Sequence, residues 1–191
     1  MSAKQIFLRL GYEATAVRDI VKGAGLASGT FYNYFSDKES VFRAIIDTYL
    51  EDLSQRIGRE RRSAENLVGF VGPAYSVFFH AIAADPETYE FTKRNEDVLK
   101  SMYNSNLMEM IVGALKNDIT EAVQLRVLPS IDPELLSSSF VGVAYELGQR
   151  MIKLRLNPEY VAQFATQLFV GGIEGFGDDS PLVLGESPAL S

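Results

Sequence analysis

The segment that decides the fold is GYEATAVRDIVKGAGLASGTFYNYFSDKESVF, residues 11–42. Its apolar spacing predicts two short helices joined by the turn Gly25-Leu26-Ala27. Gly25 can adopt the left-handed conformation that ends a helix, because it has no Cβ. Thr15 or its neighbour should open the first helix, and Ser28 is a good N-cap for the second. Two helices with a tight glycine-containing turn are typical of a helix-turn-helix.

The second of these helices carries four aromatic residues within five positions. Phe31 and Phe35 are four residues apart, so they share one face and should anchor this helix to its neighbours. The side chains left to point outward are polar or amphipathic: Thr30, Tyr32, Asn33 and Tyr34. Hydroxyls bond phosphate oxygens, Asn pairs with adenine, and Thr or Ser bonds either base edge. The outer face is therefore predicted to read DNA.

The remainder of the chain predicts helices and no convincing strand, so the expected fold class is all-α. The sequence Ser36-Asp37-Lys38-Glu39 resembles a capping box that starts a long helix. Three later helix starts share Asp or Asn, then Pro, then Glu, at Asp85, Asp132 and Asn157. The expected helices span about 2–10, 16–24, 28–34, 37–58, 64–84, 87–94, 96–127, 133–155 and 158–176.

Composition excludes several classes of function. The chain has 191 residues, no Cys and one His, which argues against disulfides, thiolate or histidine metal sites and a cysteine nucleophile. No nucleophile motif, phosphate loop or defensible carboxylate pair indicates an enzyme. The start of the chain does not resemble a signal peptide, and the apolar runs look too short and interrupted to span a bilayer. We therefore expect a soluble, cytoplasmic protein without a metal, a cofactor or a membrane partner.

Charge is distributed unevenly along the chain. The net charge is −7, yet residues 1–62 hold 10 Lys or Arg against 8 Asp or Glu, a net +2. Residues 63–191 hold 8 against 17, a net −9. A mildly basic N-terminal part joined to an acidic body is compatible with binding of nucleic acid by the N-terminal part.

Residues 11–42 resemble the DNA-binding domain of the TetR family of transcriptional regulators. The resemblance rests on the order Gly-Tyr, Thr, Asp-Ile, Ala-Gly, Gly-Thr-Phe-Tyr, Tyr-Phe, Lys-Glu and Phe. It implies a three-helix helix-turn-helix domain, expected at 1–46, and a C-terminal helical bundle for ligand binding and dimerisation, expected at 47–177. The tail 178–191 contains two Pro and no amphipathic period, so we expect it to be disordered.

The resemblance also implies roles for individual residues. Positions that match the family's base contacts are Ser28, Gly29, Thr30, Tyr32 and Asn33. Positions that match its phosphate contacts are Thr15, Arg18, Tyr34 and Lys38. Ala16 departs from the family pattern, because many members have Thr or Ser there. The side-chain cap of the first motif helix and its phosphate contact must therefore pass to Thr15 or be lost.

A second set of residues belongs either to a ligand pocket or to plain core. The family implies a cavity in the helical body, and its candidate lining consists of Tyr75, Phe78, Phe79, His80, Arg94, Met102, Tyr103, Met108, Met110 and Tyr145. Met and Tyr suit an apolar ligand of variable shape. For His80, an interior or rim position competes with a ligand contact. For Arg94, a solvated position competes with one that faces an acidic ligand.

A third set is expected at a dimer interface. One helix-turn-helix reads half of an operator, so a second copy of the chain is needed. The last two long helices are the natural interface, with candidate residues Gly142, Ala144, Gly148, Phe164, Leu168, Gly171 and Gly172. Packing within one chain is the alternative for these small residues.

The function expected from the sequence is a ligand-responsive transcriptional regulator. The most favoured form is a homodimeric repressor that a small, mostly apolar molecule releases from a near-palindromic operator. Its expected partners are double-stranded operator DNA, a small-molecule effector and a second copy of the chain. The alternative is a helical small-molecule-binding module that no longer binds a specific operator.

Overall fold

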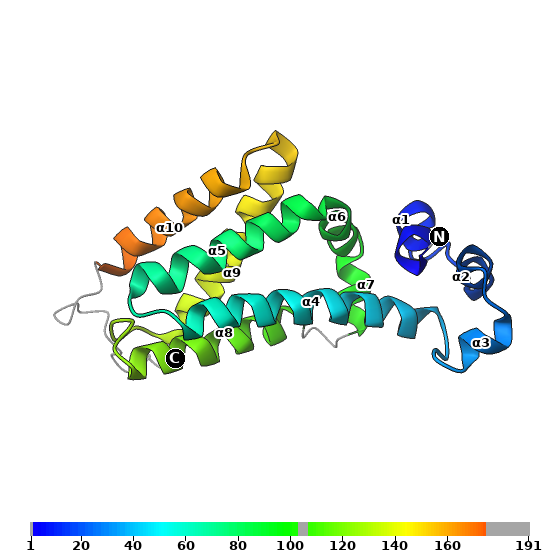
Figure 1. The fold of residues 1–191 in the computed structure, drawn as a ribbon, viewed down its shortest axis with the longest axis horizontal. Helices are drawn as coiled ribbons and strands as arrows, with labels where there is room; N and C mark the ends of the chain where they lie inside the picture. The colour runs from blue at the N-terminus through cyan, green and yellow to red at the C-terminus, as the bar shows by residue number, and fades with distance from the viewer. Residues whose placement is uncertain (1, 103–106, 175–191) are drawn as a thin grey trace, which may run out of the picture. The chain divides into compact units, whose positions relative to one another are not determined.

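The computed structural model describes residues 2–102 and 107–174, and this part of the chain is helical without a strand (Figure 1). The all-α prediction is therefore confirmed. The helices are α1 (Ala3–Leu10), α2 (Val17–Ala24), α3 (Ser28–Tyr32), α4 (Lys38–Arg62), α5 (Leu67–Ala84), α6 (Pro86–Arg94), α7 (Glu96–Met102), α8 (Leu107–Gln124), α9 (Pro133–Leu154) and α10 (Pro158–Glu174). The predicted tail, 178–191, lies outside the described residues.

The three Pro-containing helix starts are confirmed, since α6, α9 and α10 each begin at the proline. Asp132 caps α9, because its carboxylate accepts from the backbone N–H groups of Glu134 at 2.8 Å and Leu135 at 3.1 Å. The Asn157 side chain accepts from the Glu159 N–H at 2.8 Å in the same way. These bonds satisfy backbone donors that have no partner inside the helix.

Three helices end on a residue in the left-handed conformation. Gly25 after α2 has φ 68°, and the Leu26 N–H donates to the Val21 carbonyl at 3.1 Å. Arg126 after α8 and Arg155 after α9 have φ 60° and 53°. At all three ends, the N–H of the left-handed residue bonds the carbonyl three residues back, and the next N–H bonds the carbonyl five residues back. This is the Schellman arrangement, which usually employs glycine. The Gly25 end was predicted, whereas the arginines gave no comparable signal.

The range predicted as one helix, 96–127, contains α7 and α8 on either side of residues 103–106, which are not described. The helix α8 ends at Gln124, three residues before the predicted end. The helix α4 continues to Arg62, four residues beyond the predicted end.

The chain divides into two compact units. The first consists of residues 1–52 and 87–105, and the second of 53–86 and 106–191. The chain therefore passes between the units three times. Residues 87–105, which hold α6 and α7, belong to the first unit although they were predicted within the ligand-binding domain, 47–177. The predicted domain boundaries stay predictions.

An aromatic cluster forms the core of the first unit. Phe7 of α1 and Phe42 of α4 meet edge to face, with ring centroids 5.4 Å apart. Phe91 of α6 lies 4.9 Å from Phe42 and 6.2 Å from Phe7. All three side chains are buried. Burial of rings of this size stabilises by roughly 1.5–3 kcal/mol each, so α6 contributes to the unit that holds the helix-turn-helix.

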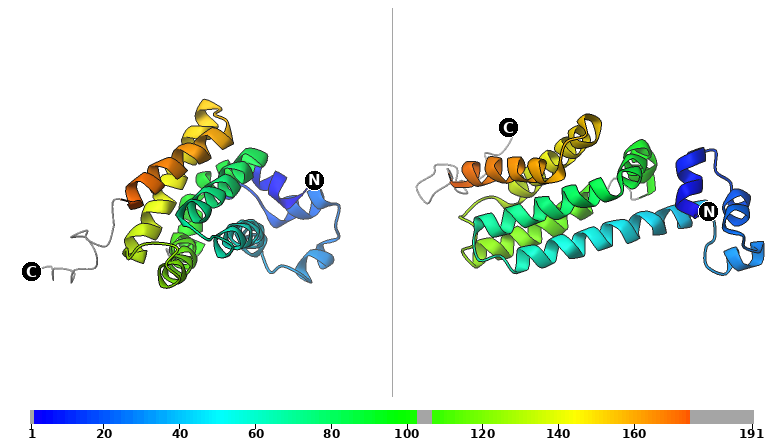
Figure 2. Two further views of the ribbon diagram at one scale, coloured as in Figure 1. Left: turned by 60° about the vertical axis from the view of Figure 1, so that its left-hand side comes forward. Right: turned by 45° about the horizontal axis from the view of Figure 1, so that its top comes forward.

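The second unit is centred on α5, which runs beside α10 (Figure 2). Tyr75 and Phe79 of α5 stack with centroids 5.8 Å apart. Tyr75 also stacks on Phe140 of α9 at 5.4 Å, and Phe140 stacks on Phe169 of α10 at 4.3 Å. This stack joins three helices through side chains that fill the interior between them.

The helix α5 corrects one expectation from the sequence. Its 18 residues, Leu67–Ala84, have a mean hydropathy of 1.6, so by length and composition it could cross a membrane. In the structure it packs against α9 and α10. Its buried residues are those of a central core helix: Phe70, Val71, Ala74, Tyr75, Phe79, Ala81 and Ile82.

Candidate DNA-binding surface

The helices α2 and α3 and the turn between them form the predicted helix-turn-helix. Ile20 and Val21 bury one face of α2, and Phe31 buries one face of α3 with 3% of its surface exposed. Gly25 bends the chain between the helices, and a Cβ added there would meet no atom within 4 Å. The requirement for glycine at this position is therefore the backbone angle and not lack of space.

The outer face of α3 is open to solvent, as the residue spacing predicts. The five residues predicted to contact bases are exposed: Ser28, Gly29, Thr30, Tyr32 and Asn33. Tyr32 and Tyr34 are 59% and 78% exposed. Phe31 and Phe35 meet with ring centroids 5.9 Å apart. Two phenylalanines thus hold a five-residue helix that is too short to be stable alone, and its polar side chains remain outside.

Of the two residues predicted to open α2, Thr15 or its neighbour, the neighbour Ala16 is the N-cap, whereas the predicted Ser28 cap of α3 is wrong. Thr15 does not cap α2, because its hydroxyl donates to the Gly11 carbonyl at 2.6 Å and the residue is 2% exposed. Ala16 is the N-cap, and the Asp19 carboxylate accepts from its N–H at 2.9 Å. Ala27 precedes α3 without a side-chain cap. The buried hydroxyl of Thr15 does not support the predicted phosphate contact.

The capping box at the start of α4 is shifted by one residue from the prediction. The Asp37 carboxylate accepts from the Ser40 N–H at 2.7 Å, and the Ser40 hydroxyl accepts from the Asp37 N–H at 3.3 Å. Asp37, and not Ser36, therefore caps the helix. The hydrogen bond from the Ser40 backbone is the main cause that holds the pKa of Asp37 below its ordinary value of 3.8.

Lys38 connects α4 to the loop before α2. Its ammonium donates to the carbonyls of Tyr12 at 2.9 Å and Glu13 at 3.1 Å, and it lies 4.5 Å from the centre of the Tyr12 ring. An ammonium has three N–H donors, so one remains for a phosphate. Arg18 has an 89% exposed side chain and only a 4.0 Å contact with Asp19, which leaves its guanidinium accessible to DNA.

Residues 2–45 match the family model described as bacterial regulatory proteins, tetR family. The N-terminal segment of this chain belongs to the TetR family. The match covers α1, α2, α3 and the start of α4, which are the elements that present the exposed face described above.

Curated relatives of the TetR-type segment are regulators with helix-turn-helix domains. The chain is 43% identical over 51 residues to the uncharacterized HTH-type transcriptional regulator YfiR of Bacillus subtilis, covering 27% of this chain and 25% of YfiR. It is 28% identical over 127 residues to the HTH-type transcriptional repressor KstR2 of Rhodococcus jostii, covering 62% of each. The chain thus spans about a quarter of the first relative and three-fifths of the second.

Solved structures of regulators share the fold over almost the whole chain. FadR from Bacillus subtilis, in complex with stearoyl-CoA, has a TM-score of 0.68 at 20% identity and covers 90% of this chain and 95% of that one. AibR, in complex with isovaleryl coenzyme A and operator DNA, has a TM-score of 0.63 at 16% identity and covers 87% and 93%. At these identities the likeness concerns the fold.

The residues predicted to line a ligand pocket are divided between core and surface. Tyr75 and Phe79 belong to the aromatic stack of the second unit, and burial raises the pKa of Tyr75 well above its ordinary value. His80 is exposed and bonds the Ser76 carbonyl at 2.8 Å. Phe78 and Tyr145 are half-buried in the second unit, and Met102 is half-buried in the first. Tyr103 and the side chains of Met108 and Met110 lie outside the described part.

Arg94 and Arg61 differ in a way that the sequence did not reveal. Arg94 pairs with Glu90 at 3.3 Å and its side chain is 71% exposed, so it is solvated here. Arg61, near the end of α4, has a side chain only 11% exposed and pairs with Asp118 of α8 at 3.3 Å. The sequence places Arg61 in the basic run Arg59-Glu60-Arg61-Arg62, which resembles a solvated helix end. Only the packing of α4 against α5 and α8 distinguishes it.

The predicted interface residues lie mostly on an exposed face of α10. Phe164 and Leu168 are 49% and 54% exposed, and Tyr160, one turn earlier, is 62% exposed. A Cβ added at Gly142, Gly171 or Gly172 would meet no atom within 4 Å. Gly148 is buried and Ala144 half-buried in α9. The role of this set in a dimer stays a prediction.

Proposed function

We propose that the chain is a ligand-responsive transcriptional regulator, without enzymatic activity, that binds double-stranded operator DNA. The observation that carries the proposal is the exposed outer face of α3, where the side chains of Tyr32 and Asn33 are exposed while Phe31 is buried. A major groove admits a helix, and Tyr, Asn, Thr and Ser side chains bond base edges. The TetR-family match over residues 2–45 supports the same role.

The base contacts that we propose come from Ser28, Gly29, Thr30, Tyr32 and Asn33. The phosphate contacts that we propose come from Arg18, Tyr34 and the third donor of Lys38. The charge pattern supports this division, because α3 itself carries no charged residue whereas the cations lie on the elements that flank it. Base contacts specify the sequence and phosphate contacts position the protein.

The proposed active form is a homodimer that contacts a near-palindromic site. Each protomer would place one α3 in a major groove, with half-sites about 34–36 Å apart. Support for the dimer comes from α10, which presents Tyr160, Phe164 and Leu168 outward while its opposite face packs on α5. A contiguous exposed apolar surface of this kind is typical of an interaction site.

The proposed effector is a small, mostly apolar molecule that acts on the helical body, with release from DNA as the favoured response. Two proteins of the same fold are named as complexes with stearoyl-CoA and isovaleryl coenzyme A, which makes acyl thioesters suitable first probes. The chain passes between the two units three times, so a change within the second unit can reach the first through the connecting segments of the chain. The protein would act in the cytoplasm, where its DNA partner lies.

Coupling of this kind has a defined thermodynamic size. An effector weakens DNA binding only to the extent that it binds better to the form that fits the operator poorly, and DNA weakens effector binding by the same factor. A coupling free energy of about 1–3 kcal/mol changes operator affinity by about 5–150-fold.

The test is fluorescence anisotropy with a labelled duplex from the region that flanks the protein's own gene. We expect tighter binding to this duplex than to a scrambled one, affinity that falls with salt, and release by at least one acyl-CoA. Equal and weak binding to both duplexes would favour the helical small-molecule-binding module. Release by a nucleotide alone would contradict a mostly apolar effector.

A further inference from the structure

Arg61 is a buried cation with only part of its hydrogen-bonding capacity used. Its Nη1 donates to the Asp118 carboxylate at 3.3 Å, and its Nε is buried without a partner in the described part of the chain. The guanidinium lies 5.5 Å from the centre of the Phe70 ring, which holds it over the aromatic face. A buried N–H without an acceptor costs about 1–3 kcal/mol, so it points to a missing ligand.

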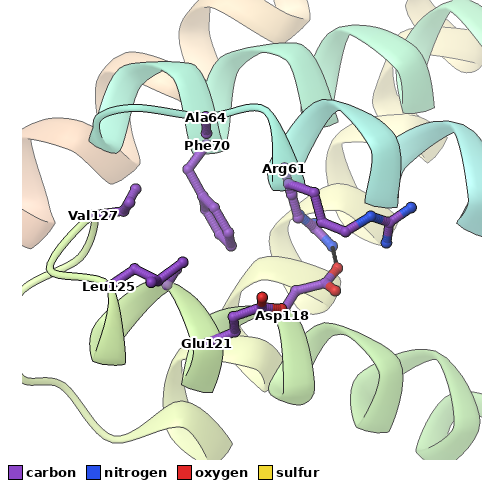
Figure 3. Close-up of a pocket in the computed structure, with 9 residues that line it drawn as sticks. Arg61, Ala64, Phe70, Asp118, Glu121, Leu125 and Val127 are labelled. Carbon is purple, nitrogen blue, oxygen red and sulfur yellow. Dashed lines mark hydrogen bonds and ion pairs between the residues drawn. The ribbon is translucent and has the colours of Figure 1, made fainter.

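A small pocket adjoins this side chain (Figure 3). Its volume is about 40 Å³, and about 10–15 Å³ accommodates one water molecule. Arg61 comes from α4, Phe70 from α5 and Asp118 from α8, and Leu125 and Val127 line the apolar side. The pocket thus combines a buried cation with an apolar wall, and its size suits one carboxylate group with a short alkyl chain that leaves toward the wall.

The geometry of the guanidinium favours a planar acceptor. Asp118 bonds Nη1, and Nε has no partner in the described residues. Nε and the adjacent Nη2 form one edge of the planar guanidinium. This edge presents two parallel N–H donors, the arrangement that a carboxylate binds in a bidentate manner. The two oxygens of a carboxylate accept one N–H each, whereas a single water oxygen would have to accept both.

The charged groups around the pocket are compatible with a bound anion. Burial lowers the pKa of the Arg61 guanidinium, and the Asp118 carboxylate offsets this effect only in part. Glu121 also lines the pocket but is exposed to solvent, which screens its charge. Arg62 adds a positive charge at the rim, and its guanidinium folds back over Gly58, where an added Cβ would lie 3.0 Å from Nη1.

We propose that this pocket binds the carboxylate of a small monocarboxylic acid on the Nε–Nη2 edge of Arg61, with its alkyl chain against Phe70, Leu125 and Val127. Butyrate is the probe that fits this description. The proposal concerns binding by the helical body alone and does not depend on the proposed DNA binding.

The experiment measures butyrate binding by ligand-observed NMR, with butanamide as the uncharged ligand of the same shape. We expect wild-type protein to bind butyrate at least tenfold more tightly than butanamide. Arg61→Lys keeps the positive charge but loses the planar edge, so butyrate binding should fall at least tenfold. Arg59→Lys is the matched control in the same helix, because Arg59 is exposed and lies outside the pocket.

Asp118→Asn tests the proposal in the opposite direction. It removes the competing negative charge, so butyrate should bind more tightly than in wild type, whereas a merely structural pair would give unchanged or weaker binding. This variant also keeps the test decisive if Arg61→Lys does not fold. Equal binding of butyrate and butanamide, or no binding of either, would mean that the pocket holds water only and would overturn the proposal.

Discussion

Lys38 holds the loop before α2 from the first turn of α4. Its ammonium bonds two successive carbonyls and lies over the Tyr12 ring, so the residue positions the start of the helix-turn-helix even without DNA. Its predicted phosphate contact would use the one remaining donor. The same side chain can therefore serve structure and DNA binding.

Replacement of this lysine tests its structural part. We expect Lys38→Met to cost about 1–2 kcal/mol, because two carbonyls lose a charged donor in a partly exposed setting. Thermal unfolding should shift down by a few degrees. Lys22→Met, on the exposed side of α2, is the control and should leave the midpoint almost unchanged. An equal shift of the unfolding midpoint in both variants would contradict a positioning role for Lys38.

Individual residues also show where sequence reasoning succeeded and where it failed. The outward side chains of α3 follow from helical spacing once Phe31 and Phe35 are taken as the anchor, and they are exposed. Thr15 or its neighbour was expected to open α2; Ala16 is the N-cap, and the Thr15 hydroxyl bonds the Gly11 carbonyl and is buried. Arg61 is buried by helices distant in sequence, which no local pattern indicates.

At the scale of elements, helix starts and helix ends differ in how clearly the sequence marks them. Starts marked by Asp or Asn followed by Pro were predictable, since both residues act locally. The left-handed residues that close α8 and α9 were not predictable, because arginine replaces the usual glycine there, although the end of α9 itself was predicted within one residue. The conformation there is imposed by the closing hydrogen bonds and by the packing that follows.

Glycine at these two ends should stabilise the protein. A non-glycine residue in the left-handed conformation costs roughly 1–2 kcal/mol of stability. Glycine avoids this strain but loses more conformational entropy on folding, which costs about 0.5–1 kcal/mol. Arg126→Gly and Arg155→Gly should each raise the free energy of unfolding by about 0.5–1 kcal/mol, measured by thermal or urea unfolding. Arg150→Gly, inside α9, should instead lower it by about 1 kcal/mol. A loss at all three positions would mean that no strain exists at the helix ends.

At the scale of the whole molecule, the exposed face of α10 predicts a dimer. Phe164→Glu and Leu168→Glu place charges on this face, so sedimentation velocity should show a shift from dimer to monomer and specific DNA binding should fall. Val68→Glu is the control, since Val68 is 55% exposed on α5 outside this face. A wild-type monomer, or dimers in all variants, would contradict the predicted interface.

The two units were only partly predictable. The resemblance placed the helix-turn-helix correctly, and the fold class followed from periodicity. The membership of α6 in the first unit did not follow, because Phe91 meets Phe7 and Phe42 over long separations in the chain. Through this packing the predicted DNA-binding elements contact residues 87–105, which in the sequence lie between the two segments of the second unit.

The central claim is that the outer face of α3 reads a specific DNA sequence. The most direct measurement compares wild type with the double variant Tyr32→Ala/Asn33→Ala by anisotropy, on the flanking duplex and on a scrambled duplex. Each lost base contact is worth about 1–3 kcal/mol. The account predicts that affinity for the flanking duplex falls about 100-fold or more while affinity for the scrambled duplex stays at the wild-type value. Specific binding that survives unchanged in the double variant would contradict it.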